Sequence, residues 1–477
     1  MSGRGGASLR SAFLPPGGMT LPRLTCFKSY DVRGELGVDF DAGIAYRIGR
    51  GFARAMVPGS VVVGRDCRAS SAELQDALVE GLRDEGVDVI DLGLCGTEEV
   101  YFATTHFNAG GGLTVTASHN PINFNGIKMV QSGSRPISSA DGLQAIHDLA
   151  AADAFGPVAE KRGSLRQDNP RDAYAARVLS FIDLGRLRPL KVLVNAGNGA
   201  AGPTFDALTD ALASAGAPLE FVRLHHTPDG SFPNGIPNPL LPENQPITGD
   251  AVRESGADLG VAWDGDFDRC FLFDETGTFI DGEYIVGLLA TAFLEKEPGA
   301  KIVHDPRVVW NTRSIVADKG GEAVVSKTGH AFVKATMRRV DAAYGGEMSA
   351  HHYFRNFMYC DSGMIPWLLV VEHMASTGRP LSALIAEMKS RFPSSGEINF
   401  RLDDPGAAMA AVDARYTPQA RTVDRLDGLS LEFADWRVNL RKSNTEPLLR
   451  LNVETAGDTA LLARRVDEIR ALVTEAR

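Results

Sequence analysis

The sequence predicts an α/β protein with three similar mixed α/β domains and a C-terminal α+β domain. Three segments share one local plan, in which an apolar strand enters a polar or glycine-containing turn and a helix follows. These segments are 61–66, 192–199 and 302–306. Because the plan recurs at wide intervals along the chain, we expect each segment to belong to a separate domain of one type.

The helix predicted after the first of these strands is the most clearly marked. Leu74, Leu78 and Leu82 recur at helical spacing. Ser70 and Glu73 match a capping box, in which each side chain bonds the other residue's backbone. The sequence therefore predicts a helix that begins after Ser70 and packs through its leucine face.

The C-terminal part of the chain follows a different plan, with strands joined by turns and a closing helix. The strands are predicted at 398–402, 436–440 and 449–453. Asp458 is the predicted cap of the closing helix. The apolar face of that helix is formed by Leu462, Val466, Ile469 and Val473.

A chain of 477 residues is too long for one hydrophobic core, so several domains are expected. Residues 1–22 are rich in Gly, Ser and Pro and lack the apolar stretch of a signal peptide, so we expect a disordered leader, with Met19 as an alternative start. The domains are predicted at 23–160, 161–258, 259–380 and 381–477.

Composition and charge exclude several classes of protein. Hydrophobic residues make up 44% of the chain and charged residues 23%, which is typical of a globular protein. A net charge of −11 disfavours a nucleic-acid partner. No stretch is long and apolar enough to span a membrane. The five cysteines form no CxxC pair, so we expect neither a zinc site nor disulfides, and a reducing cytoplasm fits.

A polar loop in the first domain presents a hydroxyl beside an imidazole. The predicted strand 113–115 leads into Thr116, and the loop then carries Ser118 and His119. Asn-Pro and Asn-Gly pairs that follow force turns, at 120–121 and 125–126. The hydroxyl of Ser118 can therefore carry a chemical group rather than only pack.

An acidic loop at the predicted boundary between the second and third domains contains Asp264, Asp266 and Asp268, followed by Arg269. Alternating carboxylates on a tight loop converge on one point, which a cation makes tolerable. Three carboxylates leave coordination positions open, so we expect a hard divalent ion such as Mg²⁺ that also binds a phosphate oxygen or water.

Two alternatives to this metal loop are a calcium EF-hand and a solvated acidic turn. The EF-hand pattern is matched by acids at the first, third and fifth positions, by Phe271 and by Glu275. Arg269, however, stands where an EF-hand requires glycine. The flanking segments 259–263 and 271–273 also predict strands rather than helices.

A third loop follows the predicted strand that ends at Gly345-Gly346. Glu347, Ser349 and His351 offer an acceptor, a hydroxyl and an imidazole at alternate positions. Sugar hydroxyls need such partners once they leave water. Taken alone, the loop is equally typical of a turn whose polar side chains bond one another.

A fourth loop, 441–447, lies between two predicted strands and is rich in cations and donors. Its polar side chains are Arg441, Lys442, Ser443, Asn444 and Thr445. Such a set suits a phosphate, and an exposed basic hairpin is the alternative. Two further segments, 30–34 with Tyr30 and Arg33, and 327–330 with His330, indicate nothing in isolation.

Together these loops resemble the α-D-phosphohexomutase superfamily, and within it the bacterial phosphomannomutases. The Ser loop, the Asp-Gly-Asp-x-Asp-Arg loop, the Gly-Glu-Met-Ser loop and the Arg-x-Ser-Asn-Thr loop occur in the family's order. The resemblance implies four domains around a central active-site cleft, each contributing one loop.

The resemblance also implies site residues. Ser118 would carry phosphate in the resting enzyme, and one Mg²⁺ per active site would be held by that phosphate with Asp264, Asp266 and Asp268. The residues implied to bind substrate are Tyr30, Arg307, Glu347, Ser349, His351, Arg441, Ser443, Asn444 and Thr445. The residues implied to be catalytic are Ser118, His119, Lys128, Arg33, Arg269 and His330.

Phosphoryl transfer requires charge neutralisation, in-line positioning and a base for the attacking sugar hydroxyl. Arg269 and Lys128 can share the developing charge. The general base stays open between Lys128 and His119 near Ser118, with His330 or His351 assisting.

The implied activity is the interconversion of mannose 6-phosphate and mannose 1-phosphate through a hexose 1,6-bisphosphate, which also serves as activator. We expect a cytoplasmic enzyme that supplies GDP-mannose synthesis, binds hexose phosphate, has no nucleic-acid or membrane partner and is a monomer or homodimer.

Other readings of the same motifs remain open. Met348 resembles the phosphomannomutase branch, which includes members that also act on glucose phosphates, whereas phosphoglucosamine mutases more often carry Gln. Arg307 replaces a Lys of some relatives, and Ala350 a Gly, so sugar preference stays open. A non-catalytic phosphosugar-binding protein is a further alternative. A serine hydrolase is excluded because Ser118 lacks a GxSxG elbow.

Overall fold

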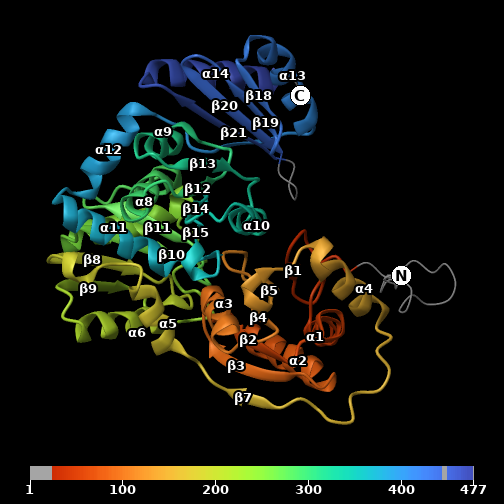
Figure 1. Ribbon diagram of the computed structural model, residues 1–477. Coiled ribbons are helices and arrows are strands. Elements are labelled where there is room, and N and C mark those ends of the chain that lie inside the picture. The colour runs from red at the N-terminus through yellow and green to blue at the C-terminus, as the bar shows by residue number, and fades with distance from the viewer. Residues whose placement is uncertain (1–23, 443–447, 476–477) are drawn as a thin grey trace, which may run out of the picture. The chain divides into compact units, whose positions relative to one another are not determined.

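The computed structural model describes residues 24–442 and 448–475 (Figure 1). The predicted leader 1–22 and the predicted phosphate-binding residues Ser443, Asn444 and Thr445 lie outside the described residues. The described chain divides into two compact units, 24–94 with 103–169, and 95–102 with 170–475. The helix α3 (Thr97–His106) crosses this division along the chain.

Unit 1 is built on one seven-stranded mixed sheet in the order β1-β5-β4-β2-β3-β7, with β6 paired to β5. Its strands are β1 (Val32–Glu35), β2 (Ser60–Arg65), β3 (Asp88–Leu94), β4 (Gly111–Val115), β5 (Phe124–Gln131), β6 (Arg135–Pro136) and β7 (Leu165–Gln167). The strand β2 lies parallel to β3 and β4, whereas β5 is antiparallel to β1 and β4. The carboxyl ends of β2 and β4 therefore meet at one edge of the sheet.

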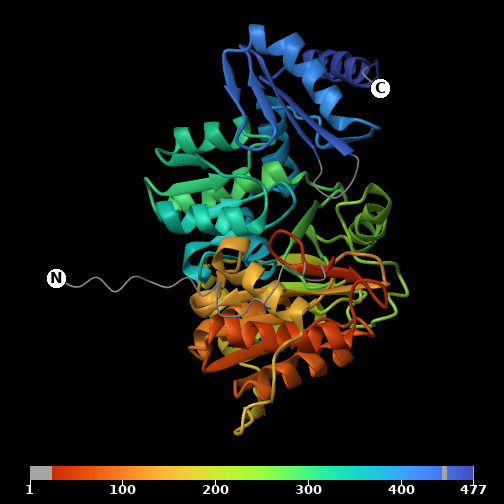
Figure 2. The same cartoon turned by 90° about the vertical axis from the view of Figure 1, so that its right-hand side faces the viewer.

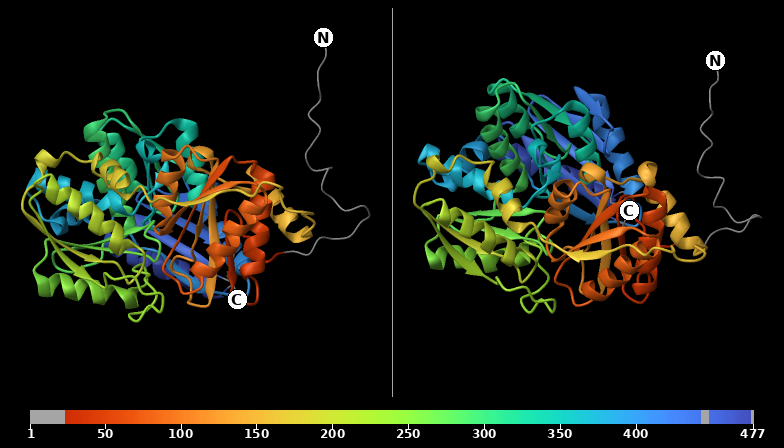
Figure 3. Two further views of the ribbon diagram at one scale, coloured as in Figure 1. Left: turned by 90° about the horizontal axis from the view of Figure 1, so that it is seen from below. Right: turned by 60° about the horizontal axis from the view of Figure 1, so that its bottom comes forward.

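Three helices of unit 1 pack together beside this sheet, as the views in Figure 3 show. They are α1 (Ala42–Met56), α2 (Ser71–Asp84) and α4 (Gln144–Ala152). The predicted leucine face is confirmed, since Leu74, Leu78 and Leu82 of α2 are buried in the core. The predicted capping box is wrong. Ser70 makes no side-chain cap, because its hydroxyl accepts a hydrogen bond from Asn125 at 2.8 Å instead.

Unit 2 contains two further sheets, each associated with helices in an α/β arrangement. The first is a four-stranded sheet in the order β11-β10-β8-β9. Its elements are α5 (Arg171–Leu179), β8 (Leu190–Asn195), α6 (Ala201–Ser214), β9 (Leu219–Leu224), α7 (Gln245–Ser255), β10 (Leu259–Trp263) and β11 (Cys270–Asp274). The strand β10 pairs in parallel with β8, and β11 returns antiparallel to β10. The sequence predicts a domain boundary at 258–259. The four-stranded sheet nevertheless includes β10 and β11 beyond that point, because β10 pairs with β8, which lies much earlier in the chain.

The second of these sheets is five-stranded, in the order β13-β12-β14-β15-β16. Its elements are α8 (Gly282–Lys296), β12 (Lys301–His304), α9 (Trp310–Asp318), β13 (Glu322–Val325), α10 (His330–Val340), β14 (Tyr344–Gly346), β15 (His352–Phe354), β16 (Cys360–Asp361), α11 (Met364–Thr377) and α12 (Leu381–Arg391). Parallel pairing of β12 with β13 and β14 is typical of strands joined by helices.

The C-terminal part of unit 2 is an antiparallel sheet in the order β17-β21-β20-β19-β18. Its elements are β17 (Ile398–Arg401), α13 (Pro405–Tyr416), β18 (Thr422–Asp424), β19 (Leu429–Glu432), β20 (Trp436–Lys442), β21 (Leu448–Thr455) and α14 (Thr459–Glu475). Figure 2 shows α13 and α14 together beside this sheet. The predicted cap is confirmed, because the Asp458 carboxylate accepts the N–H of Leu461 at 2.8 Å.

The predicted fold class is thus confirmed. Three α/β subdomains are followed along the chain by an α+β subdomain. Among the described residues, no helix has the length and apolar character needed to cross a bilayer.

Candidate active site

The serine loop of unit 1 joins the antiparallel strands β4 and β5. Ser118 has a left-handed backbone with φ of 51°, which is costly for a residue other than glycine and must be held by its surroundings. Its N–H donates to the Thr116 hydroxyl at 2.9 Å, and its own hydroxyl lies 3.0 Å from Nδ1 of His119. The loop thus presents the serine hydroxyl against an imidazole, as the sequence predicts.

Arg68 holds this loop, and sequence reasoning missed it. Its buried guanidinium donates to carbonyl oxygens of Ser118 (2.9 Å), Asn120 (2.6 Å), Pro121 (2.9 Å) and Phe124 (3.2 Å). Four carbonyls on one cation over-determine the loop conformation. The signal was available, because Arg68 follows β2 and the carboxyl ends of β2 and β4 share an edge.

The structure places three other predicted site residues of unit 1, and it shows a hydrogen bond from Arg33 to the serine loop. Arg33 donates to the side-chain oxygen of Asn120 at 2.7 Å and pairs with Asp31 at 3.0 Å. Lys128 lies on β5 opposite Thr114, the last-but-one residue of β4. Tyr30 lies in the bend just before β1. Unit 1 therefore brings Arg33 to the serine loop, whereas Tyr30 is placed only by its position in the chain.

The acidic loop of unit 2 closes the β10–β11 hairpin. Asp264, Asp266 and Asp268 are 0%, 0% and 3% exposed, and one oxygen of each lies within 4.8 Å of the others. Arg269 binds Asp264 at 2.8 Å, and the Thr97 hydroxyl donates to Asp266 at 2.6 Å. A solvated acidic turn is excluded by this burial, and an EF-hand by the two flanking strands.

These three carboxylates fit a divalent metal ion. Three carboxylates that converge away from water repel one another, and a cation bound among them would relieve that repulsion. Hard oxygen donors suit Mg²⁺, which keeps open positions for water or phosphate oxygen. The loop predicted from the sequence therefore has the oxygen donors and the geometry needed to bind a divalent metal ion.

The sugar loop runs from the end of β14 to the start of β15. Glu347 is buried and accepts hydrogen bonds from the N–H of Gly329 (2.7 Å) and the hydroxyl of Tyr353 (2.5 Å). Burial raises the pKa of Glu347, while the charge of Arg307 opposes that rise. Since Gly329 directly precedes His330, the bond to Glu347 also brings the start of α10 to this loop.

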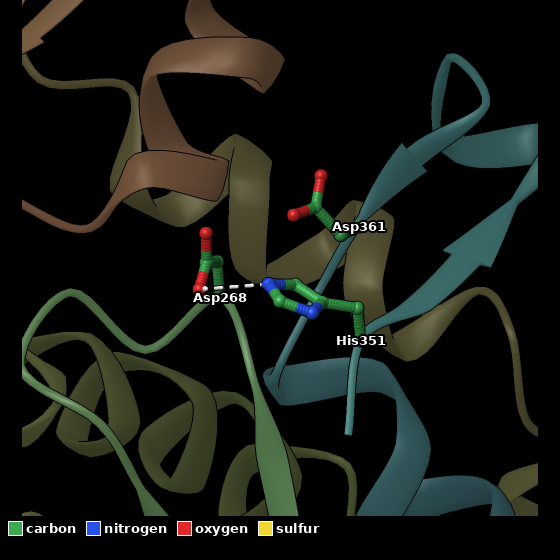
Figure 4. Close-up of side chains that lie close together, drawn as sticks. All are labelled: Asp268, His351 and Asp361. Carbon is green, nitrogen blue, oxygen red and sulfur yellow. Dashed lines mark ion pairs between the residues drawn. The ribbon is translucent and has the colours of Figure 1, made fainter. Parts of the chain in front are cut away.

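His351 connects the sugar loop with the acidic loop inside unit 2. Its Nε2 lies 3.7 Å from Asp268, and its Nδ1 lies 3.3 Å from the Ser349 hydroxyl. Figure 4 shows the imidazole pointing towards Asp268, and one ligand atom of each of Asp268, His351 and Asp361 lies within 4.8 Å of the other two. A sugar hydroxyl bound here would therefore meet an imidazole flanked by carboxylates.

Asp361 and its partner Lys334 are further residues that sequence reasoning missed. Both are fully buried, and the ammonium lies 2.5 Å from an Asp361 oxygen and 4.0 Å from the centre of the Tyr101 ring. The aromatic face and the carboxylate together compensate the buried cation. Asp361 is thus held in place beside His351.

A cluster of arginines lies where β20 and β21 approach the loop 443–447. Arg441 and Arg450 face each other across the two strands, and burial together with the charge of Arg307 lowers the pKa of Arg441. Glu397 bridges the cluster, 3.5 Å from Arg307 and 3.6 Å from Arg450. Like charges directly opposite are unfavourable unless an anion joins them, so the cluster suits a phosphate. Arg450 and Glu397 were not predicted.

The fold and these loops define a class of four-domain α/β protein equipped for phosphorylated sugars. The chain belongs to the phosphoglucomutase/phosphomannomutase family. Models of the family's α/β/α domains I, II and III match residues 25–156, 172–277 and 281–392, and the model of its C-terminal domain matches 397–472. The predicted enzyme class, a phosphohexomutase, is thereby confirmed.

Relatives at high identity extend over nearly the whole chain. A phosphomannomutase of Salmonella montevideo is 58% identical over 94% of this chain and 99% of its own length. A protein named phosphohexose mutases from Xanthomonas campestris pv. campestris is 55% identical over 95% of this chain and 100% of its own. Among solved structures, a phosphoglucomutase/phosphomannomutase family protein of Burkholderia thailandensis has a TM-score of 0.82 at 35% identity, covering 94% of this chain and 97% of that one.

Proposed function

We propose that the chain is a phosphomannomutase, which interconverts mannose 6-phosphate and mannose 1-phosphate through a hexose 1,6-bisphosphate. The observation that carries the proposal is the serine loop, where Arg68 holds four carbonyls and Ser118 has a left-handed backbone. A serine whose backbone conformation is fixed by a buried guanidinium suits a residue that carries phosphate between substrates. The phosphomannomutase names of relatives at 58% and 55% identity support the choice of sugar.

In this proposal, Asp264, Asp266 and Asp268 would hold Mg²⁺, and the phosphate on Ser118 is a further ligand through the family resemblance alone. When bound, the ion would neutralise the transferring phosphoryl group and improve the serine oxygen as leaving group. Arg269 offsets part of the negative charge of the acidic loop through its bond to Asp264.

The remaining residues of unit 2 bind and orient the sugar phosphate. Arg307 and Arg441, with Arg450, hold the phosphate that does not react, because guanidinium pairs suit a dianion. Glu347, Ser349 and His351 hold sugar hydroxyls. The loop residues Ser443, Asn444 and Thr445 belong to the same proposal through the family resemblance alone.

The proton of the attacking hydroxyl needs an acceptor, and His351 has the most suitable surroundings. Asp268 at 3.7 Å and Glu347 at 3.8 Å would stabilise the imidazole once it has taken a proton. His119, Lys128 and His330 remain the other candidates, with Arg33 and Lys128 supplying positive charge around Ser118.

The test of the phosphoserine is direct. Ser118→Ala is expected to abolish turnover and the incorporation of label from hexose 1,6-bisphosphate, whereas Ser164→Ala, on an exposed loop of unit 1, should leave both unchanged. Intact mass and peptide mapping would show a phosphate on the Ser118 peptide of fresh protein. Turnover by Ser118→Ala, or an unphosphorylated yet active protein, would overturn the mechanism. A folded, inactive wild type without phosphate would favour a sugar-phosphate-binding protein.

A broader sugar specificity is the second candidate function. It is favoured by the 55% identical Xanthomonas relative, whose name covers hexoses in general. Turnover of mannose, glucose and glucosamine 1-phosphates with the bisphosphate present would decide, and we expect the order mannose, glucose, glucosamine. A preference for glucose or glucosamine 1-phosphate would contradict the assignment.

We further propose a cytoplasmic protein that supplies GDP-mannose synthesis. All five cysteines are thiols outside any disulfide, and four of them are buried, which suits a reducing compartment. The expected oligomeric state, monomer or homodimer, stays a prediction that light scattering can check.

A further inference from the structure

A buried ion pair joins two strands of the C-terminal sheet. Arg437 on β20 and Glu454 on β21 are cross-strand neighbours, with Nη1 and Oε1 3.0 Å apart. The two residues are 4% and 1% exposed. A pair removed from water needs further hydrogen bonds to offset the loss of hydration. Most of those bonds are made outside the sheet, on the turn that precedes α9 (Figure 1).

Both members of the pair bind the backbone of this turn. Arg437 donates to the carbonyl oxygens of Pro306 at 2.6 Å and Arg307 at 2.9 Å. Glu454 accepts the N–H groups of Val309 at 3.0 Å and Trp310 at 2.8 Å, at the start of α9. Two consecutive carbonyls and two consecutive amides are thus fixed by one ion pair.

The turn in question carries Arg307 and connects to the sugar loop. Asp305 accepts the backbone N–H of Arg307 at 2.9 Å and its Nη2 at 2.7 Å, and the same carboxylate accepts the N–H of Met348 at 2.9 Å. The side chain of Arg307 also lies 3.4 Å from the Ser349 hydroxyl. A shift of the turn would therefore move the arginine and the sugar loop together.

We propose that Arg437 and Glu454 are positioning residues, which hold the Arg307 turn in the place where the guanidinium can bind the substrate phosphate. The inference rests on the proposed role of Arg307 in substrate binding. Through this pair, the strands that flank the loop 443–447 and the turn that carries Arg307 form one rigid frame. A phosphate bound to Arg307 and Arg441 would then meet guanidiniums whose spacing is set in advance.

A purely structural role for the pair is the competing explanation, so the test separates binding from stability. Arg437→Lys keeps the charge but loses the fork that spans two carbonyls, and Glu454→Gln keeps the shape but loses the charge. Arg313→Gln is the matched control. It removes a 3.4 Å ion pair to Glu432 between α9 and the same sheet, but it leaves in place the bonds from Arg437 and Glu454 to the turn, and the Arg313 side chain is 41% exposed.

Isothermal titration with mannose 1-phosphate and with inorganic phosphate supplies a readout independent of turnover. We expect both Arg437→Lys and Glu454→Gln to weaken binding of both ligands about tenfold, and to raise KM by a similar factor with kcat changed less. The phosphate content of Ser118 should stay the same. Arg313→Gln should bind as the wild type does. Binding within twofold of the wild type in both folded variants would overturn the inference.

A double-mutant comparison tests whether the pair acts through Arg307. In an Arg307→Ala background, Arg437→Lys should weaken phosphate binding by less than twofold, because the group that it positions is already absent. Full additivity of the two losses would assign the pair a role in general packing and overturn the inference. Should the wild type bind these ligands without mutase turnover, the proposed function would fail while the positioning test still stands.

Discussion

The guanidinium of Arg68 donates a 2.9 Å hydrogen bond to the carbonyl oxygen of Ser118, fifty residues further along the chain. The same group binds three more carbonyls of the loop, and Asp66 lies 3.5 Å from its Nε. The loop that presents the serine is therefore held from the segment that follows the neighbouring strand β2. Its conformation depends on one buried cation.

Replacing Arg68 tests this dependence. Arg68→Met should lower turnover about 10²-fold, because loss of the carbonyl bonds lets the serine move from its reacting position. Phosphate incorporation at Ser118, followed by intact mass, should fall in parallel. Arg166→Met, at a 52% exposed side chain of the same unit, is the control. Normal phosphorylation in folded Arg68→Met would contradict the assigned role.

Removing one charge of the acidic triad should affect stability and metal binding in opposite directions. In chelator, Asp266→Asn should raise the melting temperature slightly, since it relieves repulsion among buried carboxylates. In Mg²⁺ the wild type should be stabilised and the variant much less, because a ligand has been lost. Calorimetry in both buffers makes the comparison. An equal gain from Mg²⁺ in both proteins would show that the ion binds elsewhere.

Glu397 should compete with substrate phosphate for Arg307 and Arg450. Glu397→Gln is expected to tighten inhibition by inorganic phosphate about threefold to tenfold, because a carboxylate charge leaves the cluster. Arg450→Met should weaken it. Glu387→Gln is the control, because it alters an exposed pair between Glu387 on α12 and Arg379, which precedes that helix. Unchanged inhibition in both cluster variants would place the phosphate elsewhere.

Buried His304 should make the protein less stable in mild acid. Burial lowers its pKa to about 4, while the unfolded side chain titrates near 6.5. Below pH 6.5 the unfolded state therefore binds the extra proton, so stability is lost as the pH falls from 6.5 towards 4. Between pH 7.5 and 5 this loss is about 2 kcal/mol.

The measurement compares urea unfolding of the wild type and His304→Asn at pH 7.5 and pH 5. Asn keeps an amide donor for the Asp305 carbonyl, which the imidazole Nδ1 approaches at 2.7 Å. The variant should lose about 2 kcal/mol less than the wild type on acidification. Identical losses would assign the acid sensitivity to other groups.

Prediction from the sequence succeeded where chemistry lies in consecutive residues. Asp264, Asp266 and Asp268 alternate on a short loop, so their convergence follows from local geometry alone. The strand–turn–helix segments likewise carry their periodicity within a few residues. The boundary predicted at 258–259 instead falls within one sheet, because β10 pairs in parallel with β8 although two helices and a strand separate them along the chain.

The residues that support the site escaped prediction for the same reason. Arg68, Asp361 with Lys334, and Arg437 with Glu454 are ordinary charged residues within strands, helices or turns of unremarkable composition. Only burial and partners distant in sequence make them informative. The capping box predicted at Ser70 shows the opposite situation. The local sequence pattern predicts a helix cap, but the Ser70 hydroxyl accepts a hydrogen bond from the distant residue Asn125 instead.

By itself the sequence determined the four polar loops, the α/β class and the family, because strand and helix periodicity and the motif chemistry are properties of contiguous residues. The tertiary structure decided how those loops are held: Ser118 by Arg68, the Arg307 turn by Arg437 and Glu454, and the three buried carboxylates by Arg269 and Thr97. The physical reason is that desolvated charges require partners, and folding draws those partners from any point along the chain.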